Sequence, residues 1–266
     1  MRKTATRFGG IERTYLNFTF VVCAIVALYL ISQNWTKQLV LHDVKVYDTS
    51  ILTDTEVKSL ADVHAGSRLY GLSLSKISHR VKQNPFVKEA IVARALPYDL
   101  TITVRERNPL ALLAMPTSML SVDENGIVLP LPLERKNNLP VIANVLGQLS
   151  VGDTVRGSLM QAVEFLSDAE KLGPALSASI AEIQLSKGPG GQGDNLVAFT
   201  TASTLPVIIG NGNFRKKLLY LQMFLKEIVN SGSTDYDYVD LRFDGQIVLG
   251  AKSETVRAVN SQSGAR

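Results

Sequence analysis

The side chains that could do chemistry are few, and their spacing does not suit catalysis or metal binding. The three histidines, His42, His64 and His79, lack the spacing of metal ligands and read as surface or capping residues. No serine lies in a Gly-x-Ser-x-Gly or comparable setting that would activate it as a nucleophile. We therefore predict a protein that is not an enzyme, that takes no small-molecule substrate and that needs no cofactor or metal.

Two glycine-rich segments have the composition to approach phosphate groups. Residues 188–193 lack the Lys and Ser/Thr of a P-loop and lie between predicted strands, so we predict a flexible hairpin loop there. The second segment, Gly210–Asn213, precedes three cations, Arg215, Lys216 and Lys217, in the first turns of a predicted helix. Cations at this position oppose the helix dipole. Two alternatives stay open for them, a solvated basic face and a contact with an acidic partner.

The apolar residues are concentrated near the amino terminus, which explains a mean hydropathy of +0.11. Residues 14–36 carry no charge, and at about 1.5 Å per residue they span a hydrocarbon layer of roughly 30 Å. Four basic residues precede this run, namely Arg2, Lys3, Arg7 and Arg13. We predict a basic cytoplasmic tail at 1–14 and a transmembrane signal anchor at 15–36, with a cleaved signal peptide as the alternative.

Charge argues against a nucleic-acid-binding protein, and cysteine content argues against a protein stabilised by disulfides. The formal net charge is +4, and the basic tail supplies most of it, so the rest of the chain has no nucleic-acid footprint. The single cysteine, Cys23, lies inside the apolar run, so no intrachain disulfide can form. The exported part must be stabilised by packed cores alone.

Residues 39–107 have the pattern of a small β-α-α-β-β domain. A strand is expected at 44–47, and Thr53 with Glu56 forms a capping box that starts a helix. A second helix is indicated by Leu74, Ile77 and Val81, and it must end before Pro85. Two alternating strands follow at 87–96 and 100–104, joined by a tight turn. This order predicts three strands with two helices on one face.

Residues 108–250 are expected to form a second, β-rich domain with accessory helices. Ser158 is placed to cap a helix that ends at Gly173, and Asn213 is placed to cap another. Strands are expected at 180–185, 196–200, 207–209, 236–243 and 246–249. The last two are joined by Asp244-Gly245, which favours a two-residue type I′ hairpin. Residues 251–266 have no apolar period, which predicts a disordered tail.

These residues carry a resemblance to a known family. The segment Asn84–Val87, the pattern in residues 92–111 and the glycine at 66 look like the POTRA domain of the FtsQ/DivIB cell-division family. Residues 122–128, 139–142 and 237–244 are similar to the opening and closing parts of that family's β domain. The resemblance implies an α+β fold in which a single transmembrane helix is followed by a POTRA domain at 39–107 and a mostly antiparallel β domain at 108–250.

The resemblance also implies a function and a location. It implies a scaffold of the divisome in the cell inner membrane, single-pass type II, with most of the chain in the periplasm at the division septum. Its expected partners are FtsB/FtsL-type bitopic division proteins, other divisome membrane proteins and, through one helix, the lipid bilayer. Two alternatives are a membrane-anchored periplasmic hydrolase and a POTRA-containing secretion or assembly factor. The first needs a convergent polar site that the sequence does not show, and the second usually has several POTRA repeats or a barrel.

The family binds its small partner by adding a strand to the last strands of the β domain, which implies a site here. We expect Tyr236–Phe243 to be the open strand, extended by the hairpin strand that follows. Arg242 is the strongest candidate because a guanidinium can bind a carboxylate bidentately, and Phe243 would be an aromatic anchor beside it. For Arg94 we weigh recruitment of partners against a purely structural role. The candidate partner-binding residues are Tyr238, Asp240, Arg242, Phe243, Gln246, Val248, Arg215, Lys216, Lys88 and Arg94.

Overall fold

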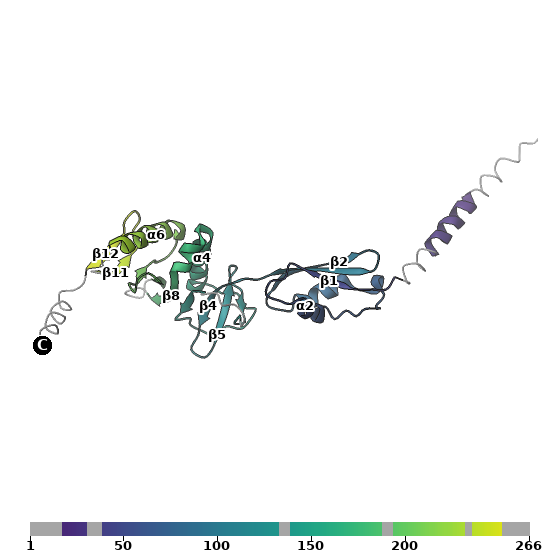
Figure 1. Ribbon diagram of the computed structural model, residues 1–266, viewed down its shortest axis with the longest axis horizontal. Helices are drawn as coiled ribbons and strands as arrows, with labels where there is room; N and C mark the ends of the chain where they lie inside the picture. The colour runs from purple at the N-terminus through teal and green to yellow at the C-terminus, as the bar shows by residue number, and fades with distance from the viewer. Residues whose placement is uncertain (1–17, 31–38, 133–138, 188–193, 232–235, 252–266) are drawn as a thin grey trace, which may run out of the picture. The chain divides into compact units, whose positions relative to one another are not determined.

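The computed structural model describes residues 18–30, 39–132, 139–187, 194–231 and 236–251 (Figure 1). The chain divides into two compact units, Met1–Glu106 and Arg107–Arg266, each of which is described by itself. Residues 18–30 are helical, and their side chains are exposed. Among the described residues, no helix combines the length and the apolar character needed to cross a membrane. The predicted span at 15–36 extends at both ends outside the described residues. The predicted tail at 1–14 lies outside them, and so does the predicted tail at 251–266 except for Ala251, which is the last residue of a strand.

The first unit has the predicted order of strands and helices. It contains β1 (Val44–Tyr47), α2 (Asp54–Ala61), a short 3-10 helix (Leu69–Gly71), α3 (Leu74–Val81), β2 (Val87–Ala95) and β3 (Asp99–Glu106). The sheet order is β1-β3-β2, with β1 parallel and β2 antiparallel to the central strand β3. Both outer strands therefore present an edge. The 3-10 helix was not predicted.

The start of α2 follows its sequence signal. The Thr53 side chain accepts a hydrogen bond from the Glu56 backbone N–H at 3.3 Å, and the Glu56 carboxylate accepts one from the Thr53 N–H at 2.7 Å. The capping box predicted from the sequence is confirmed. Behind it, the two helices and the sheet enclose one apolar core, in which Leu100, Ile102 and Val104 are fully buried.

Glu106, at the end of β3, holds the segment that leads into α2. Its carboxylate accepts hydrogen bonds from the backbone N–H groups of Ser50, Ile51 and Leu52 at 2.8–2.9 Å and from the Ser50 hydroxyl at 2.7 Å. Burial of the carboxylate opposes ionisation, but these four donors outweigh it and lower the pKa of Glu106. The ionised form is therefore a structural tie between distant parts of the unit.

Glu106→Gln should destabilise the first unit in a pH-dependent way. The amide retains one acceptor oxygen but loses the charge, which should cost roughly 1–2 kcal/mol at neutral pH. Because the pKa of Glu106 is depressed in the folded state, its contribution is full above the unfolded value and is lost as pH falls through the folded value. Melting temperatures measured from pH 7 to pH 3 should differ at neutral pH and converge in acid. The exposed Glu89→Gln is the control, and a difference independent of pH would contradict this role.

The described residues of the second unit form one large, mostly antiparallel sheet. Its order is β12-β11-β10-β9-β8-β7-β4-β5-β6. The strands are β4 (Pro109–Ala114), β5 (Met119–Asp123), β6 (Val128–Leu129), β7 (Val141–Ala143), β8 (Ile180–Lys187), β9 (Asp194–Thr200), β10 (Val207–Ile208), β11 (Tyr236–Asp240) and β12 (Val248–Ala251). The pairs β4–β7, β7–β8 and β10–β11 are parallel, and the others are antiparallel. The expected α+β fold with a large β sheet is confirmed.

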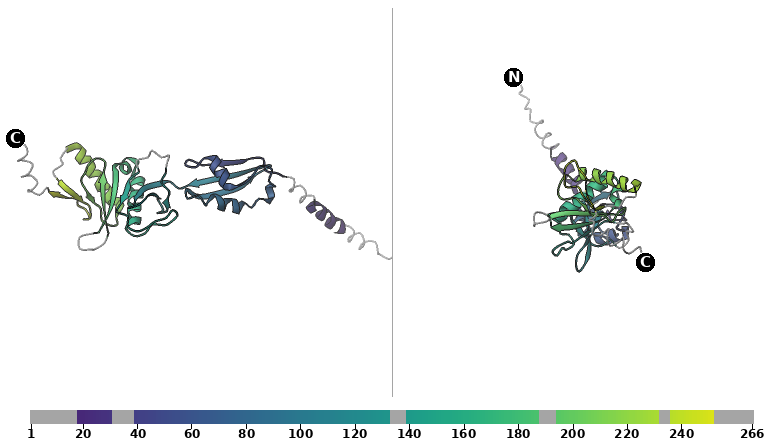
Figure 2. Two further views of the ribbon diagram at one scale, coloured as in Figure 1. Left: turned by 90° about the horizontal axis from the view of Figure 1, so that it is seen from below. Right: turned by 90° about the vertical axis from the view of Figure 1, so that its left-hand side faces the viewer.

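Helices pack on this sheet and share its core. They are α4 (Ser158–Leu172), α5 (Pro174–Ser179) and α6 (Phe214–Ser231), and α4 contacts both α6 and strands β4, β8 and β9 (Figure 2). Two details differ from the prediction. The N-cap of α4 is Gly157, and Ser158 is its first helical residue. A short helix, α5, follows Gly173 immediately, because Pro174 is well suited to the first position of a helix.

The predicted two-residue hairpin between the last two strands is wrong. β11 ends at Asp240 and β12 begins at Val248, so residues 241–247 form a longer connection. Asp244-Gly245 lies within a turn of this connection, and Gly245 has a φ of 82°. The dipeptide therefore forms a turn, but the connection between the two strands is longer than these two residues. The predicted loop at 188–193 lies outside the described residues.

Candidate functional site

The candidate site is the end of the large sheet formed by β10, β11, β12 and the connection at 241–247, which we call the C-terminal edge. The expectation that Tyr236–Phe243 is the open strand is wrong. β11 pairs with β10 on one side and with β12 on the other. At this end of the sheet, the terminal strand is β12, Val248–Ala251, which has no strand paired on its outer side among the described residues. The tertiary structure thus moves the open backbone one strand outward.

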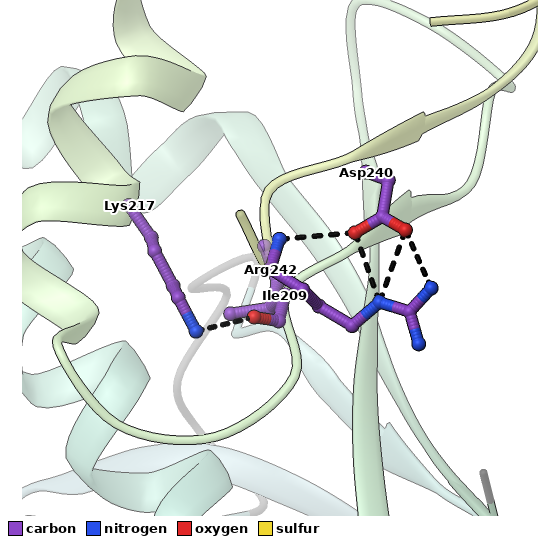
Figure 3. A network of polar contacts seen from close by, with 4 residues as sticks. All are labelled: Ile209, Lys217, Asp240 and Arg242. Carbon is purple, nitrogen blue, oxygen red and sulfur yellow. Dashed lines mark hydrogen bonds and ion pairs between the residues drawn. The ribbon is translucent and has the colours of Figure 1, made fainter. Parts of the chain in front are cut away.

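A tight ion pair lies where β11 ends. Asp240 is 3% exposed, and its carboxylate accepts hydrogen bonds from Arg242 Nε at 2.9 and 3.0 Å, from Nη2 at 2.5 Å and from the Arg242 backbone N–H at 2.9 Å (Figure 3). Burial opposes ionisation of Asp240, but the hydrogen bonds and charge of Arg242 lower its pKa overall. The same contacts raise the pKa of Arg242. Both groups are therefore charged at neutral pH.

This pair changes how Arg242 must be interpreted. The sequence suggested a guanidinium free to meet a partner's carboxylate, but the structure binds it to Asp240 within the chain. Removing the guanidinium leaves the buried Asp240 carboxylate uncompensated, which is costly. Arg242→Glu would therefore perturb the fold of the C-terminal edge together with any interface. That substitution alone cannot isolate a binding role.

The segment Gly210–Asn213 approaches the side chain of Arg242 closely. Gly210 has a φ of 65°, a backbone conformation that favours glycine. A Cβ added to it would also lie 2.8 Å from Arg242 Cγ, so a side chain at this position would clash. Lys217 donates a hydrogen bond from Nζ to the carbonyl of Ile209 at 2.7 Å (Figure 3). It donates another to the carbonyl of Asn211 at 2.9 Å. Within the segment that the sequence suggested as an anion cradle, the Asn211 carbonyl oxygen therefore faces a cation.

Lys217 is a structural residue that the sequence interpretation missed. Lys217 is 6% exposed. Burial lowers its pKa, although the negative charges of Asp244 and Asp240 act in the opposite direction. A signal was present, because Lys217 lies four residues before Leu221 and thus on the buried face of α6. The three cations therefore have different roles, since Arg215 and Lys216 are exposed.

Lys216 connects the start of α6 to the β11–β12 connection. Its Nζ lies 3.3 Å from Asp244 Oδ1 and 5.9 Å from the centroid of the Tyr220 ring. The hydrogen bond and charge of Asp244 raise the pKa of Lys216. The fold thus brings two candidate segments, the basic start of α6 and the chain around Arg242, to the same place.

The C-terminal edge also presents apolar side chains to solvent. Tyr238 is 39% exposed, Phe243 51% and Leu249 36%. Tyr238 lies opposite Gly250 in the ladder, and a Cβ on Gly250 would come within 2.2 Å of the Tyr238 ring. The ring therefore lies across the glycine. Among the other candidates, Gln246 is exposed in the connection and Val248, which begins β12, is half-buried.

Lys88 and Arg94 lie in the first unit, apart from this group. Both are on β2 and half-buried. Arg94 donates hydrogen bonds to the carbonyls of Leu69 at 3.0 Å and Leu72 at 2.9 Å, and its guanidinium stacks 5.2 Å from the centre of the Tyr70 ring. These contacts favour the structural interpretation of Arg94. Reversing its charge would break three contacts of the native fold.

No catalytic arrangement is seen in the part of the chain that the structure describes. Within it, no group of three or more His, Cys, Asp or Glu side chains is placed to hold a metal ion. At the C-terminal edge, Arg242 is paired with Asp240, Lys216 with Asp244, and Lys217 with two backbone carbonyls, which suits a rigid surface. Its chemistry is that of recognition: an open strand, exposed aromatic side chains and fixed charges.

Comparison with known proteins gives matches along most of the chain. Residues 40–107 match the family described as POTRA domain, FtsQ-type, and residues 111–242 match the family described as Cell division protein FtsQ/DivIB, C-terminal. A protein of Geotalea daltonii named Cell division protein FtsQ is 28% identical over 252 residues, which is 94% of this chain and 87% of that protein. A protein of Salinibacter ruber with the same name is 28% identical over 259 residues, covering 92% and 95%.

Proposed function

Since this chain belongs to the FtsQ/DivIB family of cell division proteins, we propose that it is a non-enzymatic, bitopic scaffold of the divisome. In this proposal it links other division proteins at the septum, and it binds an FtsB/FtsL-type pair of small membrane proteins through its C-terminal edge. The domain organisation follows the sequence: a tail at 1–14, an anchor at 15–36, a POTRA domain at 39–107, a β domain at 108–250 and a tail at 251–266.

One observation supports the binding proposal: among the described residues, no strand pairs with the outer side of β12. A strand at the end of a sheet presents a row of backbone N–H and C=O groups that another chain can pair with. The ring of Tyr238 lies opposite Gly250 of this strand, and the connection that leads into the strand carries the exposed ring of Phe243 and the charges of Arg242 and Asp244, the latter paired with Lys216. Backbone pairing would supply affinity, and these side chains would select the partner and its register. We propose Gln246 and Val248 as further contacts and Asp240 as the residue that positions Arg242.

The location is proposed from the amino-terminal sequence. A run of 23 uncharged residues follows a tail with four basic residues, which supports a single span with the amino terminus in the cytoplasm. The bulk of the chain would then lie in the periplasm, attached to the cytoplasmic membrane as a type II protein. For the POTRA domain we propose recruitment contacts that include Lys88, with Arg94 acting mainly to position its own surface.

Co-purification from solubilised membranes tests the scaffold function. The tagged full chain, extracted in mild detergent from its own cells, should retain small bitopic proteins with a coiled-coil region, identified by mass spectrometry. A matched bait that ends at residue 107 keeps the anchor and POTRA segment and should lose them. Equal recovery with both baits would remove the second unit from the interface, and recovery with neither would contradict the scaffold function.

A further inference from the structure

Exposed apolar side chains gather at one end of the first unit. Four of the six exposed large apolar residues described in residues 39–106 lie there: Val40 at 40%, Tyr70 at 45%, Leu96 at 67% and Tyr98 at 47%. We call these four residues the apolar tip. Single exposed apolar residues need no explanation, but a contiguous group is typical of an interaction surface.

Hydrogen bonds between segments distant in the sequence hold the apolar tip together. Val40 forms an antiparallel bridge with Arg68, two residues before Tyr70. The backbone N–H of His42 donates to the Tyr98 carbonyl at 2.7 Å, and the two rings are 6.2 Å apart. Residues 40–42 therefore lie between the Tyr70 segment and the turn after β2.

Arg94 completes the arrangement from β2. Arg94 stacks on Tyr70 and donates hydrogen bonds to Leu69 and Leu72. These contacts hold the segment around Tyr70 against β2. Leu96 follows Arg94 by two residues, just after the end of this strand. The apolar tip is thus presented by rigid, hydrogen-bonded chain. Such preorganisation lowers the entropy lost when a surface is engaged.

The charges around the apolar tip are predominantly basic. The two acids near it are paired with lysines, Asp43 with Lys58 at 3.4 Å and Asp99 with Lys45 at 2.7 Å. Arg68 is exposed, and neither it nor Arg94 has a carboxylate partner among the described residues. Aromatic and aliphatic side chains flanked by arginine suit the boundary between lipid headgroups and acyl chains.

The length of the chain limits how far this end can be from the membrane. The predicted span ends at Thr36, four residues before Val40. Even fully extended, four residues reach at most about 14 Å. The headgroup region adds several ångströms beyond the hydrocarbon layer. The apolar tip is therefore held within reach of the bilayer surface by a connection too short to let the unit move away.

We infer that the apolar tip inserts into the membrane interface and seats the first unit end-on against an anionic bilayer. Leu96 and Tyr98 enter the headgroup layer, while Arg68 meets lipid phosphates. This inference rests on the membrane anchor of the proposed function. Seating the unit would fix the direction in which the rest of the exported chain leaves the membrane.

Fluorescence quenching in vesicles tests this directly. The full chain is reconstituted into vesicles of phosphatidylethanolamine and phosphatidylglycerol that carry a lipid quencher near the headgroups. In a Cys23→Ser background, an environment-sensitive probe is attached at Leu96→Cys or, as the control, at Glu89→Cys. Glu89 is exposed on β2, the strand that leads to Leu96, and lies about 23 Å from it at roughly 3.3 Å per residue. We expect quenching several-fold stronger at position 96.

A second pair of samples excludes insertion driven by the probe itself. With the probe at Arg68→Cys, the double variant Leu96→Ser and Tyr98→Ser should lose most of the quenching, whereas Ile91→Ser should not. Ile91 is similarly exposed, at 57%, but lies outside the apolar tip. An equal loss in both variants would overturn the assignment of the tip.

The native cysteine separates failure of this inference from failure of the anchor. A probe on Cys23 in the otherwise unchanged chain should be quenched by a lipid whose quencher lies deep in the acyl region. Without that signal the anchor itself would be refuted. If Cys23 is quenched but positions 89 and 96 are equal, or if position 96 is shielded only when a division protein is added, membrane seating of the apolar tip is overturned.

Discussion

Ile102→Asp is expected to unfold the first unit of this protein and leave the second unit folded. Ile102 is fully buried in the central strand β3, between Val46 on β1 and Val92 on β2. A carboxylate there has no partner, and burying it would cost several kcal/mol, which is on the order of the whole stability of so small a domain. The two units have separate apolar cores, so the damage should stay local.

Hydrogen exchange of the detergent-solubilised full chain measures this outcome. Amides of β1, β2 and β3 should lose protection in the variant, while those of β8 and β9 should keep it. Thr103→Asp is the matched control, because residue 103 points to the half-exposed face of the same strand and should cost far less. Unchanged protection in Ile102→Asp would show that β3 is not the core strand. Loss in both units would show that the units fold together.

Proline substitutions in β12 are expected to separate binding from folding. Successive backbone N–H groups of a strand point to opposite sides, so Val248→Pro and Leu249→Pro remove donors that face in opposite directions. One of these donors faces β11 and the other faces the open side. The variant that loses the outward donor should keep its melting temperature while partner affinity falls about 10- to 100-fold, equivalent to roughly 1.4–2.8 kcal/mol.

The alanine variants at the same two positions control for side-chain loss. Val248→Ala and Leu249→Ala keep both backbone donors and should bind far better than the corresponding prolines. Affinity is measured by calorimetry with the exported segment of the small bitopic partner. If neither proline weakens binding, strand addition at β12 is refuted. If both proline variants have a lower melting temperature by circular dichroism and neither binds, the substitutions have disrupted the fold of β12. The outward amide is then blocked instead by N-methylation of that residue in a semisynthetic chain.

The Asp240–Arg242 pair shows why a residue's type does not settle its role. An arginine near the end of a strand has the chemistry to bind a partner's carboxylate, and that expectation was sound as chemistry. Asp240, two residues before Arg242, is buried, and Gly210 lies against the arginine stem, so the guanidinium is bound to a carboxylate of the same chain although its side chain is 38% exposed. Arg242 contributes to the C-terminal edge as a fixed charge.

Local signals in the sequence determined the elements of the first unit. The capping box at Thr53 and Glu56, the helical spacing of Leu74, Ile77 and Val81 and the alternation in 100–104 act over a few residues, so they survive without tertiary context. The same holds for the helical stretches near 158 and 214. Hydrophobic spacing reports which face is buried, because burial is the main driving force of folding.

Only the tertiary structure decided which strand is open and which charges are engaged. Strand order is set by long-range pairing, so a sequence that ends in two strands does not reveal that β12 is outermost and β11 is covered by β10. Lys217 and Arg242 look like surface cations in the sequence, yet their partners, the Ile209 carbonyl and Asp240, are supplied by chain geometry. The helical and strand periods follow from backbone geometry, whereas an edge or an ion pair depends on which segments the packed core brings together.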